Sequence, residues 1–246
     1  MNDNRAQISI LDAFVAYVGA WLVGNLAAGA VLAASGEKTI AAAGHGWLVG
    51  ISVAQWVPML LALWLVGRRL STGNFATGSF VHDTFVHGYG LSFRAIDLIG
   101  IPIGVVTQLV VVPLLYRPLE SIWPATFGSD EVEKRARDLY GHPSSAGLAL
   151  LILVAVVGAP LVEELVYRGL LQGAVGRTVH QWCGWLAVIL VAALFALVHF
   201  SPVEYPGLFL VGLVLGACAL RTGRLGMGIL THAAFNAAAL ALVARS

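Results

Sequence analysis

Charged residues are scarce in this sequence. Of its 246 residues, 11% are Asp, Glu, Lys or Arg, whereas 59% are hydrophobic. A soluble domain carries about 25% charged residues, so this chain could not cover a water-facing surface. The shortage of charge excludes a soluble globular protein, and the lipid bilayer is the surrounding that we expect.

Basic clusters and paired cysteines are missing as well. The net charge is +1 and the basic residues are scattered, so nothing indicates nucleic acid as a partner. The two cysteines, Cys183 and Cys218, lie in apolar stretches. There they are expected to pack as small side chains rather than to form a disulfide or a metal site.

Long apolar runs account for this composition. Most of them approach the roughly 20 residues that a helix needs to cross the hydrocarbon core, and Gly, Pro and charged residues separate them. The predicted fold class is therefore all-α: a polytopic bundle of seven or eight transmembrane helices, forming one domain over 1–246 in the plasma membrane. The seven expected spans are 11–34, 46–66, 95–116, 146–172, 183–200, 206–220 and 225–243.

The sixth expected span, 206–220, is short for a membrane crossing. As a helix it would measure about 22 Å, whereas the hydrocarbon core is about 30 Å thick. We therefore expect this span to be tilted, re-entrant or extended by its neighbours.

Ionisable side chains interrupt three of the later runs. On insertion scales such a side chain at mid-membrane costs about 2.5–3.5 kcal/mol, so it is retained for a function or as one member of a pair. Three helices thus bring polar groups into one apolar bundle, and we expect the functional site where they converge. The residues concerned are Glu163, Glu164 and Arg168 in the fourth run, His199 at the end of the fifth, and His232 and Asn236 in the seventh.

Helical spacing gives the two glutamates different surroundings. Glu164 and Arg168 are four residues apart, so they share a helix face and can form an ion pair. Glu163 is turned about 100° away from that cation, and a carboxylate without a cation beside it is the better proton acceptor. We expect Glu163 to be the general base and Glu164, supported by Arg168, its structural neighbour.

His232 and Asn236 are also four residues apart and therefore point the same way. A neutral imidazole and a carboxamide can both donate hydrogen bonds to a developing oxyanion. Nearby aromatic residues have simpler interpretations: Phe195 is expected to pack, and Tyr167 is expected to be an interfacial anchor rather than a hydroxyl of the site.

In a straight bundle these residues lie at different depths. His199 falls past the centre of its span and His232 before the centre of its own, which separates them by about 12 Å along the membrane normal. A catalytic cluster does not permit that spread. We expect helix tilt, or a break at Gly169 or Pro202, to bring the two histidines together.

The C-terminal part of the chain holds three motifs, each in an apolar run: Glu163-Glu164-x-x-x-Arg168, Phe195-x-x-x-His199 and His232-x-x-x-Asn236. In order and separation they resemble the motifs of the CAAX prenyl protease and bacteriocin-processing intramembrane proteases, the CPBP or Abi family. The resemblance covers about residues 146–244, the expected catalytic core. The first 145 residues match that family only in being helical and apolar.

The resemblance implies hydrolysis of a peptide bond by an activated water molecule. Glu163 and His199 look like the pair that activates the water, and His232 and Asn236 look like the groups that stabilise the oxyanion. The neighbouring Glu-Arg ion pair looks like a support for the first glutamate. The implied substrate is a protein or peptide that is embedded in the membrane or associated with it.

Metal dependence stays open, because members of this family have been described both as metalloproteases and as metal-free, glutamate-dependent enzymes. No cofactor is required by the sequence. If a divalent metal such as zinc binds, the expected ligands are Glu163, His199 and His232, since two histidines and a carboxylate form a full catalytic zinc set. The close helical spacing of zincin ligands is absent.

Signatures of other intramembrane proteases are absent. The sequence has no His-Glu-x-x-His, Gly-x-Gly-Asp or Gly-x-Ser-Gly motif and no phosphate-binding loop. Site-2-type metalloproteases, intramembrane aspartyl proteases and rhomboid-type serine proteases are therefore excluded.

Two other functions compete with proteolysis. A proton-coupled transporter also uses buried Glu and His, but it should show interrupted helices in both halves, and here the polar residues concentrate in one half. A non-catalytic scaffold or immunity protein of the same fold stays open, because motifs predict competence rather than use. Peptide maturation, bacteriocin self-immunity and membrane-protein turnover are all compatible, and nothing indicates a prenylated partner.

Overall fold

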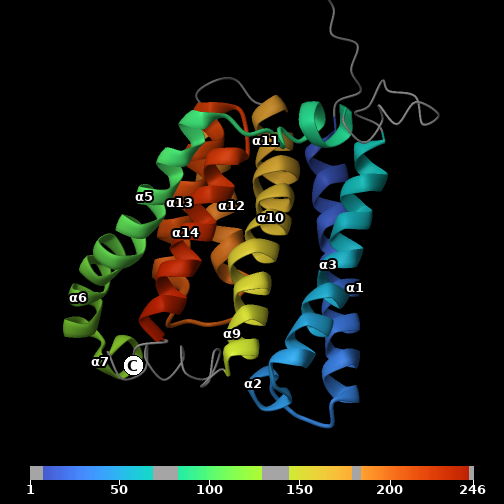
Figure 1. Ribbon diagram of the computed structural model, residues 1–246. Coiled ribbons are helices and arrows are strands. Elements are labelled where there is room, and N and C mark those ends of the chain that lie inside the picture. Colours follow the sequence, from blue (N-terminus) through green and yellow to red (C-terminus); the bar gives the residue numbers. More distant parts are fainter. Residues whose placement is uncertain (1–7, 69–82, 129–143, 179–183, 244–246) are drawn as a thin grey trace, which may run out of the picture.

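The described residues are helical almost throughout (Figure 1). The computed structural model describes residues 8–68, 83–128, 144–178 and 184–243, and these ranges contain no strand. The predicted all-α class is thus confirmed for the described part of the chain. Cys183 lies outside the described residues, whereas Cys218 is a free, buried thiol, as expected for a packing residue.

The N-terminal helices α1 (Ile10–Ala34) and α3 (His45–Gly67) form an antiparallel hairpin, joined by the short α2 (Ile40–Ala43) (Figure 1). Gly24 permits their close approach, because a Cβ at this position would lie 2.6 Å from the carbonyl oxygen of Gln55. Small residues at such contacts let two membrane helices pack backbone against backbone.

A third long helix runs over 95–122 and packs against the last helix, α14 (Gly226–Val243). Its contact with α14 again depends on small residues: a Cβ on Gly104 would lie 2.1 Å from the carbonyl oxygen of Thr231. The close packing fixes α14, and therefore His232, relative to the third helix. The third helix comprises η3 (Ala95–Ile99), α5 (Gly100–Val106), η4 (Thr107–Val111) and α6 (Val112–Ile122), preceded by η2 (Asp83–Gly88) and followed by α7 (Pro124–Phe127).

The fourth long helix lies at the centre of the bundle, between the N-terminal hairpin and the C-terminal helices (Figure 1). Two stretches of it are π-helical, with hydrogen bonds to the fifth residue back, an arrangement often found at functional sites. All nine residues of the second π stretch are buried. The segments are α9 (Ser145–Leu151), η5 (Ile152–Gly158), α10 (Ala159–Glu163), η6 (Glu164–Gln172) and α11 (Gly173–Thr178).

Helices α12 (Gly184–Leu197) and α13 (Tyr205–Thr222) form a second close pair. Gly212 and Gly216 of α13 face Ala192 and Val188 of α12, where an added Cβ would come within 2.9 Å and 2.8 Å of their side chains. Because α12 ends at Leu197, the turn that leads to α13 begins before the expected end of the fifth span.

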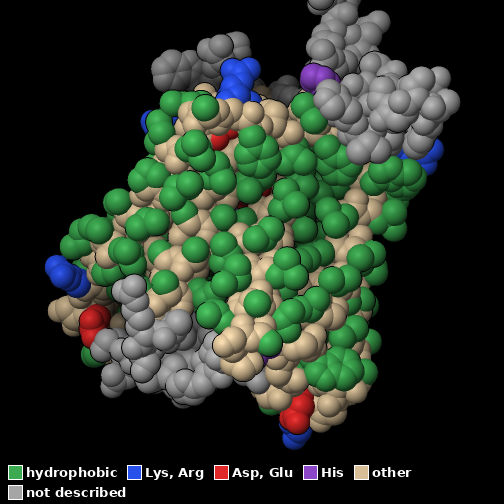
Figure 2. Space-filling model, in the orientation of Figure 1, with side chains coloured by type: hydrophobic (Ala, Val, Ile, Leu, Met, Phe, Trp, Pro, Cys, Tyr) green, Lys and Arg blue, Asp and Glu red, His purple; other side chains and the backbone are tan. Residues whose placement is uncertain are grey.

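Five of the described helical stretches are long and apolar enough to cross a membrane: 10–34, 45–67, 95–122, 145–176 and 205–222. Hydrophobic side chains cover the flank of the molecule, and charged ones lie mainly near its two ends (Figure 2). The chain is therefore a multi-pass membrane protein. Seven crossings are not established, because α12 and α14 are apolar but shorter, whereas the sixth expected span is lengthened by its neighbours into α13.

Candidate active site

A buried ion pair occupies the centre of the bundle. Arg168 Nη1 lies 2.8 Å from Glu164 Oε1, and both side chains are fully buried. The guanidinium also donates from Nη2 to the Gly212 carbonyl at 3.1 Å and lies over the ring of Phe195, 4.9 Å from its centroid. The ion pair expected from the spacing of four residues is confirmed, and it joins the central helix to α13 and α12.

His232 lies between the two glutamates. Its Nδ1 is 3.2 Å from Glu164 Oε1 and its Nε2 is 3.8 Å from Glu163 Oε2. The Glu163 side chain is 24% exposed, whereas that of Glu164 is fully buried. The two carboxylates thus differ as the spacing predicts: one belongs to a buried ion pair, and the other is accessible beside an imidazole.

The contact with Glu164 determines what His232 can donate. A carboxylate paired with Arg168 only accepts hydrogen bonds, so the Nδ1 of His232 carries a proton. A neutral His232 then has a lone pair at Nε2 and cannot donate from that atom. If the ring carries both protons, Nε2 becomes a donor, and the charges of Arg168, His232 and the two carboxylates balance.

His199 lies just beyond the end of α12, where its ring is held by the helix itself. Nδ1 donates to the Phe195 carbonyl at 2.6 Å, which is one of the terminal carbonyls without an intrahelical partner. Because a carbonyl can only accept, Nδ1 carries the proton, and the neutral ring presents a lone pair at Nε2. This lone pair can accept a proton from water.

The next residue, Phe200, has a φ of 50°, which is unusual for a residue with a side chain. Such left-handed conformations are strained and persist only where the surroundings impose them. The reversal at Phe200 turns the chain immediately after His199 and directs it toward α13.

The ring of Phe195 packs against both histidine rings. Its centroid lies 4.9 Å from that of His199 and 5.9 Å from that of His232, both in edge-on contacts. Both histidines therefore contact one buried ring, His199 from the turn after α12 and His232 from α14. The break falls in the turn that contains Pro202 and not at Gly169, which lies within η6.

Asn236 is engaged with the backbone of the central helix. Its Nδ2 donates to the Ala155 carbonyl at 2.7 Å. In η5 the N–H of Ala159 bonds to Val154, five residues back, so the next carbonyl, that of Ala155, would require the N–H of residue 160. That residue is Pro160, which has no N–H. The Asn236 amide supplies the hydrogen bond that the proline cannot make.

The position of Asn236 modifies the expected oxyanion pair. Asn236 lies about one turn, roughly 6 Å, along α14 from His232. One of its N–H groups is used by Ala155, and the amide has a second N–H. The structure thus brings His232 to the glutamates and places Asn236 in the adjacent turn, in contact with η5.

Two tyrosines and a glutamine lie around the buried ion pair and Phe195. Tyr167 is buried, its hydroxyl lies 3.2 Å from that of Tyr17 on α1, and its ring packs edge-on against Phe195. The expectation that Tyr167 anchors at the interface is wrong, because only 4% of it is exposed. Gln172 donates from Nε2 to the Gly216 carbonyl at 2.9 Å.

Of Gln172 and Tyr17, which sequence reasoning did not identify, only Gln172 has a spacing that could have indicated its position. Gln172 is polar, buried and four residues after Arg168, and the two donate to carbonyls that are also four residues apart, those of Gly212 and Gly216. That repeated spacing places both contacts on one face of each helix. Tyr17 gives no such signal, because its partner lies 150 residues away in the sequence.

The donor types present would suit zinc, but their arrangement does not form a metal centre. Among the described residues, no group of three or more His, Cys, Asp or Glu side chains could hold a metal ion. Both histidines of the expected ligand set use Nδ1 for other contacts, His199 for a carbonyl and His232 for Glu164, so a metal ion would have to bind at Nε2. Glu163, His199 and His232 are not grouped closely enough in this structure to hold one.

Comparison with known proteins agrees with the motifs. Residues 145–238 match the family described as "Type II CAAX prenyl endopeptidase Rce1-like", so the expected family is confirmed for the part of the chain that contains all three motifs. The chain is 31% identical over 97 residues to an Escherichia coli protein named "Uncharacterized 24.3 kDa protein". That match covers 38% of this chain and 44% of the relative, which is less than half of either. No solved structure matches significantly.

Proposed function

We propose that this chain, whose residues 145–238 match the Rce1-like family, is an intramembrane endopeptidase. Its substrate is a protein or peptide embedded in the plasma membrane or associated with it. The observation that carries the proposal is the partly exposed carboxylate of Glu163 beside His232, within an apolar bundle. Unpaired ionisable groups at such depth are expensive, and their convergence on a buried ion pair supports a catalytic use.

Glu163 is the general base. It is the more accessible of the two carboxylates, so water and a scissile peptide can reach it. Glu163 takes one proton from water, while the lone pair of His199 Nε2 accepts a hydrogen bond from the other O–H of the same molecule. The water oxygen attacks the carbonyl carbon, and the carbonyl electron pair moves to its oxygen. Glu163 then passes that proton to the leaving nitrogen, and the oxyanion re-forms the carbonyl double bond as the carbon–nitrogen bond breaks.

His232 stabilises the oxyanion when its ring carries both protons. In that state Nδ1 remains bonded to Glu164, and Nε2 donates toward the carbonyl oxygen of the substrate. The buried pair of Glu164 and Arg168 fixes the orientation of the ring. The second N–H of Asn236 is the further donor available from α14.

Cleavage by the reconstituted full-length chain tests this function. Proteoliposomes containing the protein are incubated with a library of membrane-associated peptides, and new termini are identified by mass spectrometry. We expect cleavage by the unaltered chain and a loss of about 10²–10⁴-fold in Glu163→Gln, the range for general acid–base catalysis. Glu37→Gln, at an exposed carboxylate before α2, is the matched control and should cleave normally.

The outcome separates the competing functions. Cleavage that persists in Glu163→Gln would contradict the proposed role of this residue. Solute flux through the proteoliposomes without any cleavage would favour a transporter, and neither flux nor cleavage would favour a scaffold. A chelator added to the same assay shows whether the activity depends on a metal.

A further inference from the structure

Tyr17 of α1 and Tyr167 of the central helix form a buried pair beside the candidate active site. Their hydroxyls lie 3.2 Å apart, their rings pack edge-on with centroids 5.7 Å apart, and each residue is 4% exposed. Tyr167 follows Glu163 by four residues, about one helical turn. Among the described residues, each hydroxyl has only the other as a hydrogen-bond partner. This single contact therefore holds both hydroxyls in place.

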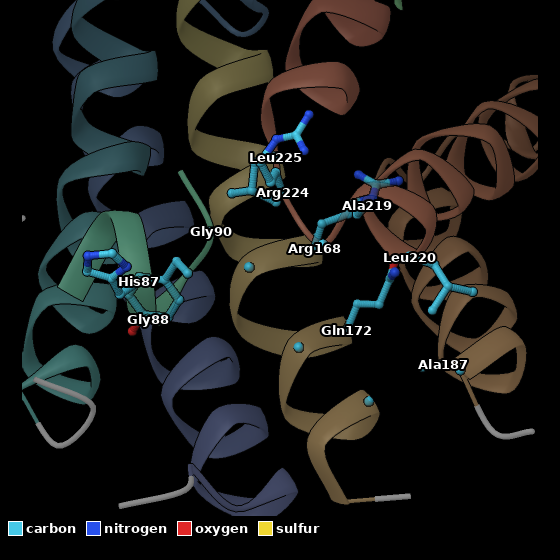
Figure 3. Close-up of a pocket in the computed structure, with 16 residues that line it drawn as sticks. His87, Gly88, Gly90, Arg168, Gln172, Ala187, Ala219, Leu220, Arg224 and Leu225 are labelled. Atoms are coloured by element: carbon cyan, nitrogen blue, oxygen red, sulfur yellow. The ribbon is translucent and has the colours of Figure 1, made fainter. Parts of the chain in front are cut away.

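Neighbouring residues of the central helix contact two different parts of the bundle. Arg168 and Gln172 extend toward α13, where they donate to backbone carbonyls, and they line a cavity of about 330 Å³ (Figure 3). Tyr167 instead contacts α1, which belongs to the N-terminal hairpin. The family match begins only at residue 145, so Tyr17 comes from a part of the chain that the match does not include.

The ring of Tyr167 connects this pair to both histidines. It packs edge-on against Phe195, with centroids 5.2 Å apart and ring planes at 87° to each other. Phe195 is buried, and its ring in turn contacts those of His199 and His232. Because a phenyl ring makes no directed hydrogen bond of its own, its orientation depends on the groups packed around it. A shift of Tyr167 is therefore transmitted through Phe195 to the two histidines.

We propose that Tyr17 is a positioning residue of the active site, which holds Tyr167 by its hydroxyl and thereby keeps Phe195 packed against both histidines. Without the Tyr17 hydroxyl, that of Tyr167 is buried with no partner, a costly state that the ring relieves by moving. A displacement of about 1 Å in a catalytic group can cost about 100-fold in rate. This role rests on the proposed function, and it makes α1 part of the active site.

Tyr17→Phe tests this role, because it removes the hydroxyl and keeps the ring. In the proteoliposome assay, with the fastest-cleaved peptide of the library, we expect kcat to fall by about 10–100-fold. KM should stay within about twofold, since Tyr17 acts through Tyr167 and not on the substrate. Tyr89→Phe is the matched control, because the buried Tyr89 hydroxyl donates to the Leu63 carbonyl at 2.7 Å. Its ring packs against Phe85. The control should lose a similar amount of thermal stability and keep its kcat.

The variant that combines Tyr17→Phe with Tyr167→Phe completes a double-mutant cycle. Both substitutions break the same contact, so the kcat of the double variant should be no lower than that of the slower single variant. Losses that multiply, a normal kcat in Tyr17→Phe, or an equal loss in Tyr89→Phe would overturn this role and leave the proposed function intact. A change confined to KM would overturn it too. If the unaltered chain cleaves no peptide, the proposed function fails, and this role fails with it.

Discussion

Arg168 uses its guanidinium to connect three helices, and it is the cation that pairs with the buried carboxylate of Glu164. One nitrogen pairs with Glu164, another bonds to Gly212 on α13, and the plane of the group lies over Phe195 of α12. Removal of one partner from a buried pair leaves an uncompensated charge, which is more harmful than removal of both.

Arg168→Met should therefore destabilise the protein by about 3–5 kcal/mol, because the fully buried Glu164 would lose its cation. The double variant Glu164→Gln with Arg168→Met should recover part of that loss. Thermal unfolding in detergent measures both changes. Equal melting temperatures for Arg168→Met and the unaltered chain would contradict the inferred importance of this pair.

Asn236 and Pro160 form a second dependent pair, in which a side chain replaces a missing backbone N–H. Asn236→Ala should lower the free energy of unfolding by about 1 kcal/mol, because the Ala155 carbonyl would lose its donor. In a Pro160→Ala background the helix supplies its own N–H, so the same substitution should have little effect on stability.

Activity in this double-mutant cycle separates the two roles of Asn236. If Asn236 acts only through the backbone of η5, Pro160→Ala restores the cleavage rate of Asn236→Ala together with its stability. If the second N–H donates to the oxyanion, stability returns and the cleavage rate does not. A stability loss that Pro160→Ala leaves unchanged would contradict the backbone contact.

At the scale of elements, the turn after α12 positions His199. Phe200 adopts a φ of 50° there, a conformation that glycine adopts without strain. Phe200→Gly should keep the turn and therefore the cleavage rate, whereas Phe200→Pro, with φ fixed near about −65°, should displace His199 and abolish cleavage. Cleavage assays on the two variants, with melting temperatures as a check of folding, make the comparison. Equal activity in both would contradict the importance of this conformation.

The contact between α5 and α14 positions His232 in the same way. A Cβ on Gly104 would lie 2.1 Å from the Thr231 carbonyl, directly beside His232, so the two helices would have to separate. Gly104→Ala should reduce both melting temperature and cleavage rate. Gly19→Ala is the control, since a Cβ on Gly19 would meet nothing within 4 Å. Indistinguishable behaviour of the two variants would show that α14 tolerates the displacement.

For the whole molecule, hydropathy and charge predict much of the arrangement. Low dielectric makes every intramembrane ionisable residue conspicuous, so the sequence predicts that Glu163, Glu164 and His232 meet, and the contacts of His232 with both glutamates agree with this. The spacing of four residues predicts the ion pair of Glu164 with Arg168, because such residues share a helix face. The family of residues 145–238 was likewise readable from three motifs.

Other features depend on tertiary contacts that carry no local signal. The π stretch η5 changes which carbonyl is left unpaired, and that register decides the partner of Asn236. The early end of α12 determines the depth of His199, although the apolar run continues to Phe200. The contact of Tyr17 with Tyr167 joins the N-terminal hairpin to the site across 150 residues.

The central claim is that Glu163, which takes the proton from water, and His232, which holds the oxyanion, act as one unit in the hydrolysis of the peptide bond. Residues that act together lose activity together, so their substitutions are not additive. The most direct test is the cleavage rate of Glu163→Gln, His232→Ala and the double variant in the same proteoliposomes. We predict that each single substitution lowers the rate by about 10²–10⁴-fold and that the double variant is no slower than the worse single variant. Losses that multiply in the double variant, or a single variant that cleaves normally, would contradict the claim.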